Sequence, residues 1–270
     1  MAPREALLLL GAQLEPLHHA FRPVVHPEED PDGLDDIRQL VGRHQMGVCL
    51  RLDRSYASNL GDSRSLVEQI DAIGVPAERA DVVLDCGFIC SAADPAIGVS
   101  GPLSHLLDGA WQSVTVAVGS FPGPAFFDGR LTRRVISIPR LEVALWEKIR
   151  QRWPGAVDYG DYGVDHPGPP PDEARPVPNL RYTTPEHWRL YQWPKDAFGG
   201  HSTFHQLCQS LVRSSDWPQD GPAFSWGDQQ IALAACERIG PGSGSEWKAY
   251  AVSHHLAAIV DSLQPDGSAE

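Results

Sequence analysis

Residues Gly47–Asp53 read GVCLRLD, a short apolar run that ends in an arginine and an aspartate. Similar runs follow at Asp81–Asp85 (DVVLD) and Ser113–Gly119 (SVTVAVG), and helix-like segments separate the three. Short apolar strands that alternate with helices are typical of parallel βαβ units, in which each crossover helix covers the sheet. The pattern therefore predicts an α/β fold.

The chain continues this alternation to its end. Apolar residues recur at helical spacing in residues 34–43, 63–73 and 141–152. Further strand-like segments are expected at 22–26, 134–138, 156–159, 179–183, 188–191 and 247–253, of which 179–183 and 188–191 either pair as a hairpin or flank a turn. A count of about eight strands predicts a single (β/α) barrel-like domain, incomplete or distorted. An open, doubly wound parallel sheet is the alternative, because its local pattern is the same.

Domain organisation follows from length and composition. The chain has 270 residues and 42% hydrophobic residues, which suits one globular domain spanning 1–270. No repeat of fixed period and no clear linker divides it. The proline-rich segment 167–178 is interpreted as an exposed loop of that domain.

Charge and cysteine content narrow the class of protein. The formal net charge of −13 and the pI near 5.2 disfavour binding to a phosphate backbone, so nucleic acid is not an expected partner. The opening LLLL is too short to span a membrane. Five cysteines, an odd number, favour reduced thiols and a cytoplasmic protein. Cys86 and Cys90 lack the second ligand pair that a zinc site needs.

Several common catalytic motifs are missing from the sequence. It contains no GxxxxGK[ST], no GxGxxG after the first strand, no HExxH and no GxSxG. These absences disfavour P-loop nucleotide hydrolases, ordinary Rossmann dehydrogenases, zinc proteases and α/β-hydrolases.

Polar residues gather where the expected strands end. Ligands of parallel α/β folds lie outside the carboxyl ends of the strands, so these residues are candidates for one site. The stretch Asp158–Gly168, DYGDYGVDHPG, is the densest group of them. The expected catalytic residues are Asp161, His166 and His254, and the expected substrate-binding residues are Arg51, Asp85, Tyr162, Arg181 and Asp228.

Each candidate also has a structural explanation. Asp161 can cap a turn, and Tyr162 can cover the rim of the sheet. Asp228 can cap the helix that follows FSWG. Arg51 and Arg181 can pair with nearby aspartates without binding any ligand. Since His254 and its neighbour follow an expected strand, only one of the two should face a pocket.

Six motifs in this order resemble those of the beta family proteins, named after a phage T4 beta protein and widespread in bacteria. The motifs are VCLRL, VLDCG, VDYGDYGVDHPG, LRYTT, FSWGDQQI and WKAYAVSHHL, and they span about residues 47–263. Relative to that family the chain is expected to be short at its amino end. The resemblance implies no particular activity, and it suggests a link to phage–host conflict.

Two functions follow as hypotheses. The first is an enzyme whose polar pocket acts on a phosphate-bearing or other anionic small molecule, with a divalent metal compatible with its carboxylates and imidazoles. The second is a non-catalytic interaction or sensor protein of a phage-defence type, which would bind a protein partner through an exposed apolar patch. The sequence does not decide the cofactor or the oligomeric state.

Overall fold

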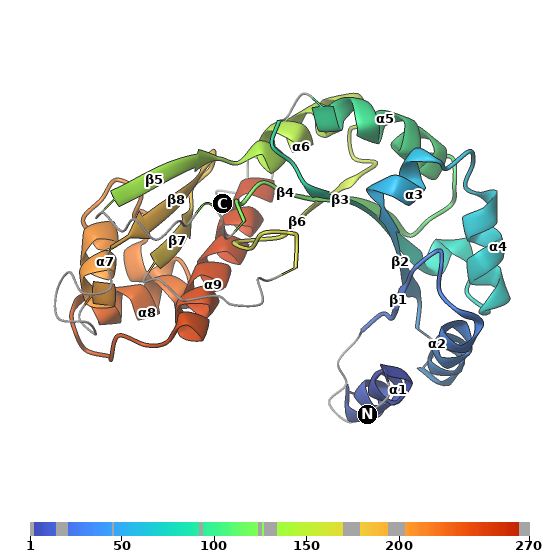
Figure 1. Cartoon of the computed structure of the whole chain (residues 1–270), viewed down its shortest axis with the longest axis horizontal. Helices are drawn as coiled ribbons and strands as arrows, with labels where there is room; N and C mark the ends of the chain where they lie inside the picture. Colours follow the sequence, from blue (N-terminus) through green and yellow to red (C-terminus); the bar gives the residue numbers. More distant parts are fainter. Residues whose placement is uncertain are drawn as a thin grey trace, which may run out of the picture. The chain divides into compact units, whose positions relative to one another are not determined.

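The structure is a computed structural model that describes residues 3–14, 21–44, 46–91, 94–123, 126, 134–169, 179–193 and 203–264. The chain forms two compact units, which are described separately (Figure 1). Unit 1 comprises Met1–Val118 and Ala144–Asp161, and unit 2 comprises Gly119–Val143 and Tyr162–Glu270. The single domain that the sequence suggests stays a prediction.

A five-stranded parallel sheet forms the centre of unit 1, in the order β1-β2-β3-β4-β6. Its strands are β1 (Val24–Val25), β2 (Val48–Asp53), β3 (Ala80–Phe88), β4 (Ser113–Gly119) and β6 (Asp158–Asp161). The helices are α1 (Pro3–Leu14), α2 (Pro31–His44), α3 (Arg54–Ser58), α4 (Arg64–Ala72), α5 (Asp94–Leu107) and α6 (Leu141–Arg152), with a 3-10 turn at Ala77–Arg79. The expected strands at 47–53, 81–85 and 113–119 are thus confirmed.

The two faces of this sheet differ in chemistry. Apolar residues at every second position are buried, among them Leu50 and Leu52 on β2 and Val82 on β3. Strand order follows chain order, and right-handed crossovers then put successive helices on the same face. Figure 1 shows α3, α4 and α5 along one side of β2 and β3. The other face carries the polar side chains.

Unit 2 combines an antiparallel sheet with helices. The sheet has the order β5-β8-β7, with β5 (Arg134–Pro139), β7 (Asn179–Thr183) and β8 (His187–Gln192). The helices are α7 (Thr203–Val212), α8 (Trp226–Ala235) and α9 (Gly244–Leu263), with a 3-10 turn at Gly221–Ala223. A core of aromatic and aliphatic side chains joins strands to helices, and it includes Tyr182, Tyr191, Phe204, Leu207, Ile231 and Tyr250.

Two expectations about the strands need correction. The segments at 134–138, 179–183 and 188–191 are strands, and 179–183 pairs with 188–191 as a hairpin, but all three belong to a separate antiparallel sheet and not to the parallel one. The expected strand at 247–253 is wrong, because these residues lie within α9. Ser243 and Glu246 form a capping box that starts the helix, and Trp247, Tyr250 and His254 recur at helical spacing. The closed barrel is not confirmed; the chain has a mixed α/β fold whose parallel sheet is flanked by helices.

The described residues contain no helix long and apolar enough to cross a membrane.

The cysteines differ in burial, and this predicts their reactivity. Burial raises the pKa of Cys86 to about 11 and also raises the pKa of Cys208, whereas Cys90 and Cys236 are exposed. We expect iodoacetamide at pH 8 to label Cys90 and Cys236 within minutes and to reach Cys86 and Cys208 only after unfolding, because the thiolate is the reactive form. Peptide mass spectrometry would measure this. Fast labelling of Cys208 in the folded protein would contradict the packing of unit 2.

The raised pKa of Cys86 also has a consequence for stability. The folded state holds the thiol proton more tightly than the unfolded state, whose thiol has a pKa of 9.0. The contribution of this group is therefore complete below pH 9.0 and is lost as the pH rises through about 11.

Candidate functional site

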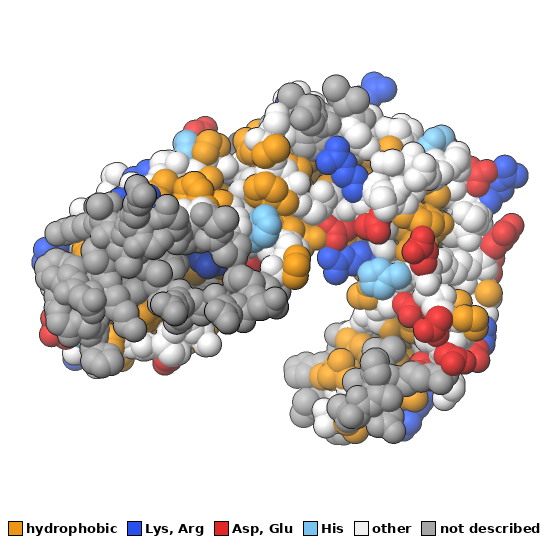
Figure 2. Space-filling view, viewed as in Figure 1, with side chains coloured by type: hydrophobic (Ala, Val, Ile, Leu, Met, Phe, Trp, Pro, Cys, Tyr) orange, Lys and Arg blue, Asp and Glu red, His pale blue; other side chains and the backbone are white. Residues whose placement is uncertain are grey.

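Arg51 and Asp85 lie side by side at the carboxyl ends of β2 and β3. The register pairs Asp53 with Asp85, and Arg51 Nε donates to Asp85 Oδ2 at 2.9 Å. The other carboxylate oxygen, Oδ1, accepts from Gly87 N at 2.9 Å. The Arg51 side chain is 45% exposed and that of Asp85 only 11%, so a buried carboxylate orients an accessible cation. Figure 2 shows acidic, basic and histidine side chains near one another over this part of unit 1.

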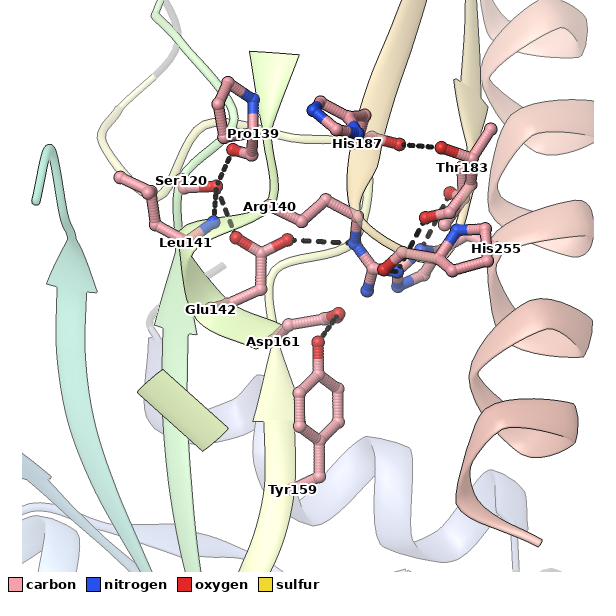
Figure 3. A network of polar contacts seen from close by, with 12 residues as sticks. Ser120, Pro139, Arg140, Leu141, Glu142, Tyr159, Asp161, Thr183, His187 and His255 are labelled. Carbon is pink, nitrogen blue, oxygen red and sulfur yellow. Dashed lines mark hydrogen bonds and ion pairs between the residues drawn. The ribbon is translucent and has the colours of Figure 1, made fainter. Parts of the chain in front are cut away.

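Asp161 is the last residue of β6. It lies at the same edge of the sheet as Arg51 and Asp85 but on the opposite face. Ser113 Oγ donates to Asp81 Oδ1 at 2.7 Å, which places Ser113 on the polar face. Side chains alternate along β4, so Val118 points to the opposite face, and Val118 is the register partner of Asp161. Tyr159, on that face too, donates its hydroxyl to Asp161 Oδ2 at 2.6 Å (Figure 3). Asp161 therefore does not join Arg51 and Asp85.

In unit 2, the loop after β6 brings one carboxylate between two cations. Arg181, on β7, donates from Nη1 to Asp165 Oδ1 at 3.1 Å and to the carbonyl oxygen of Val164 at 2.6 Å. Lys248, on α9, places Nζ 2.6 Å from Asp165 Oδ2. Gly163 has a φ of 58°, a left-handed conformation that lets the loop turn back toward β7.

Phe121 connects His166 to the same group. His166 Nδ1 lies 3.1 Å from the Phe121 carbonyl oxygen, and Arg181 Cζ lies 4.8 Å from the centre of the Phe121 ring. A carbonyl only accepts, so Nδ1 carries the proton. Glycines flank the imidazole: a Cβ at Gly168 would lie 3.1 Å from both Cδ2 and Nε2 of His166. We call Asp165, His166, Arg181 and Lys248 the loop cluster.

Two basic side chains of the loop cluster contact the same carboxylate, that of Asp165. Burial lowers the pKa of Arg181, and Asp165 opposes that shift. Arginine keeps its proton in proteins, so Arg181 is a cation in spite of its burial.

Asp228 and His254 meet in the interior of unit 2. Asp228 is 0% exposed and His254 3%. His254 Nδ1 lies 2.9 Å from Asp228 Oδ2, and His254 Nε2 lies 2.9 Å from the Thr183 carbonyl oxygen. Tyr182 donates its hydroxyl to Asp228 Oδ1 at 2.7 Å. The Thr183 carbonyl only accepts, so Nε2 donates to it, and Nδ1 shares a hydrogen bond with the buried carboxyl group of Asp228.

This buried group fixes β7 to the two helices. Asp228 belongs to α8, where Ser225 caps the first turn, and His254 belongs to α9. His255 is buried as well, and its Nδ1 lies 3.0 Å from Thr183 Oγ1. The expectation that only one of the two histidines faces a pocket assumed that they follow a strand; they lie within α9, and both contact Thr183 of β7. Burial favours a positioning role for Asp228 and His254.

A second buried ionic network lies between β5 and the turn that joins β7 to β8 (Figure 3). Arg140 Nε donates to Glu142 Oε1 at 3.1 Å, and both side chains are at most 3% exposed. Ser120 donates its hydroxyl to Glu142 Oε2. Arg140 Nη1 donates to the carbonyl oxygens of Thr184 and Pro185. These contacts hold the turn against the start of α6.

A model of the beta protein family matches residues 1–261 of the chain. The chain belongs to the beta protein family. The match begins at residue 1, which extends the similarity well beyond the motifs that start at Gly47. No curated protein and no solved structure matches this member of the beta protein family.

The structure thus divides the predicted site residues of this beta family protein into separate groups. Arg51 and Asp85 are in contact in unit 1, and Asp161 lies on the opposite face of the same sheet. Arg181 and His166 meet through Phe121 in unit 2, with Tyr162 at the start of their loop. Asp228 and His254 form the buried pair.

The sequence interpretation missed two members of the loop cluster, Asp165 and Lys248. Lys248 lies in the segment 247–253, which was expected to be a strand, and a strand there gave no reason to place its side chain near residue 165. The capping pair Ser243 and Glu246 was the signal that could have identified the helix.

Two further features of the described residues bear on ligands. A hollow of about 300 Å³ is lined by Tyr56, Asn59, Leu60, Gly61, Asp62 and Ser65, none of which is a predicted site residue. Within the described parts of the chain, no three His, Cys, Asp or Glu side chains are grouped so that they could hold a metal ion.

Proposed function

We propose that this beta family protein binds an anionic small molecule at the loop cluster of unit 2. The observation that carries the proposal is the sharing of one carboxylate, Asp165, by two cations, Arg181 and Lys248. Arg181 is 26% exposed and has lost much of its hydration, so a further anion would stabilise it. The planar guanidinium suits a carboxylate or phosphate, which it can bind through two parallel hydrogen bonds.

His166 supplies the acid–base group of the proposed site. It lies in the same loop as Asp165, and its Nδ1 is oriented by the Phe121 carbonyl. An imidazole held in one tautomer is a suitable proton donor or acceptor near neutral pH. In this proposal Asp228 and His254 position β7 and α9, and thereby Arg181 and Lys248, without touching the ligand.

The test is direct binding at low salt. We expect isothermal titration with phenyl phosphate to give a measurable dissociation constant, and Arg181→Gln to weaken it about tenfold or more, because a charged hydrogen-bond donor is lost. Lys248→Gln should weaken it less, since this side chain is 55% exposed. Added salt should weaken binding in all variants.

Arg189→Gln is the matched control. Arg189 lies on the neighbouring strand β8 and pairs with Asp216 at 2.8 Å, with 29% of its side chain exposed. Its loss removes the same charge from the same sheet, and binding should stay within about twofold. Equal weakening by Arg181→Gln and Arg189→Gln would mean that net charge, and not the loop cluster, attracts the anion.

One observation favours the alternative of a non-catalytic interaction protein. Three apolar residues of α9, Leu256, Val260 and Leu263, are 59%, 60% and 48% exposed. Their spacing puts them on one side of the helix, as in a surface that contacts another protein. The absence of anion binding by the wild-type protein would favour this alternative. A role in phage–host conflict would then be carried out through a protein partner bound at this surface.

A further inference from the structure

The hollow of unit 1 lies on the connection that follows β2. This strand ends at Asp53, α3 begins at Arg54, and the lining residues run from Tyr56 to Ser65 at the start of α4. In parallel α/β folds, such a connection borders the carboxyl edge of the sheet, where ligands bind. The volume of about 300 Å³ is at the lower end of the range of about 300–1,000 Å³ for ligand sites, so the hollow suits a small molecule.

Local hydrogen bonds fix several of the lining residues. Asp53 Oδ1 accepts from the Tyr56 backbone N–H at 2.8 Å, which sets the first turn of α3 and the backbone from which the Tyr56 ring extends. Asn59 Nδ2 donates to the Ser55 carbonyl at 2.9 Å, so its amide oxygen points away from that carbonyl. Leu60 is 9% exposed and adds an apolar wall. The lining therefore combines an aromatic ring and an aliphatic side chain with fixed polar groups.

The charges at the hollow are balanced. Asp62 is the one charged residue among the six that line it, and Arg64 pairs with Asp62. Asp62 Oδ1 accepts from the Arg64 backbone N–H at 2.9 Å, and Oδ2 accepts from Nε at 2.9 Å and from Nη2 at 2.6 Å. Chiefly through its side chain, Arg64 lowers the pKa of Asp62, which is therefore an acceptor at neutral pH. Because Arg64 neutralises Asp62, the lining favours neither an anion nor a cation.

Donors and acceptors are mixed among the other groups of the lining. The hydroxyls of Tyr56 and Ser65 form no hydrogen bond with any described residue, and each can both donate and accept. A carboxylate has about four lone-pair sites, so Asp62 can accept one more hydrogen bond, and the amide oxygen of Asn59 is a further acceptor. A matching ligand must donate and accept at several points, as hydroxyl groups do.

We infer that this hollow binds a neutral polyhydroxylated ring, a monosaccharide, with one face of the ring against Tyr56. The C–H groups of such a ring pack on the aromatic face and on Leu60, while its hydroxyls exchange hydrogen bonds with Asn59, Asp62 and Ser65. The inference is independent of the anion site proposed for unit 2, and neither depends on the outcome for the other.

Saturation-transfer difference NMR tests the inference on the wild-type protein with D-glucose, D-galactose, D-mannose and D-ribose as probes. At least one of these sugars should give a signal. Its titration should yield a dissociation constant of about 1–10 mM, because each neutral hydrogen bond at a water-exposed site contributes little. No signal from any of the sugars would overturn the inference.

Ser65→Ala and Ser58→Ala form a matched pair of variants. Both remove an exposed hydroxyl from unit 1, but Ser58 does not line the hollow, and its hydroxyl donates to the Arg54 carbonyl at 2.7 Å. Ser65→Ala should weaken binding of the sugar about threefold or more, whereas Ser58→Ala should stay within about twofold. Equal affinities of the two variants would place the sugar outside the hollow and would contradict the inference.

The ligand class has its own readout. Cyclohexanol has a saturated ring with a single hydroxyl, so it keeps the apolar contact and loses most of the hydrogen bonds. The sugar should bind at least about tenfold more tightly than cyclohexanol. Tyr56→Leu, which keeps an apolar side chain but removes the ring and its hydroxyl, should abolish the sugar signal. Equal affinity for cyclohexanol, or undiminished sugar binding by Tyr56→Leu, would refute the proposed mode of recognition.

Discussion

His254→Leu is expected to lower the free energy of unfolding by about 3–5 kcal/mol, because it leaves the buried carboxyl group of Asp228 without its imidazole partner. Asp228 is 0% exposed, and its Oδ2 lies 2.9 Å from His254 Nδ1. The Thr183 carbonyl oxygen also loses its donor. Urea unfolding followed by tryptophan fluorescence would measure the change, since the core of unit 2 contains several indoles.

A double-mutant cycle separates the ion pair from general packing. Asp228→Asn alone should also destabilise, because it removes the buried carboxyl group that His254 Nδ1 contacts. The combined change His254→Leu with Asp228→Asn should cost less than the sum of the two single changes, by about 1–3 kcal/mol. Simple additivity would show that the two groups act independently, contrary to their contact.

Arg140→Leu is the second change with a large expected effect. It would leave Glu142 buried with only the Ser120 hydroxyl as a donor among the contacts described above, and it would remove the donors to the carbonyls of Thr184 and Pro185. We expect a loss of about 3–5 kcal/mol in the free energy of unfolding. Loss of the guanidinium from the face of Trp188, 5.0 Å away, should also change the fluorescence of the folded protein.

The control for this prediction is Arg150→Leu. Arg150 pairs with Glu147 on α6, and 60% of its side chain is exposed. Water therefore reaches this ion pair in the folded state as well as in the unfolded state. A loss of no more than about 1 kcal/mol is expected. Similar losses in the two variants would mean that burial of Arg140 and Glu142 does not govern their contribution.

The parallel sheet of unit 1 could be predicted from the sequence because its signals are local. In a run such as Val48–Asp53, every second residue is apolar and buried, and the last residue is polar. This pattern arises because successive side chains of a strand point to opposite faces of the sheet. The hairpin of β7 and β8 was readable for the same reason. The family could also be assigned from the ordered motifs, as the match over residues 1–261 shows.

The helix α9 could not be separated from a strand by its apolar residues alone. The segment Trp247–Ser253 has aromatic and aliphatic side chains that suit both elements, and the capping pair Ser243 and Glu246 lies outside it. The antiparallel pairing of β5 could likewise not be predicted from local sequence patterns, since its partner β8 is about fifty positions further along the chain.

What the sequence by itself determined is the set of reactive side chains, the alternation of strands and helices, and the family. Only the tertiary structure decided which of those side chains meet: Asp165 with Arg181 and Lys248 at the surface of unit 2, Asp228 with His254 inside it, and Asp161 on the far face of the other unit's sheet. The physical reason is that local periodicity sets the direction of a side chain within its own element. Its partners are set by the packing of elements that lie far apart along the chain, and the free energy of that packing is not encoded in any short stretch.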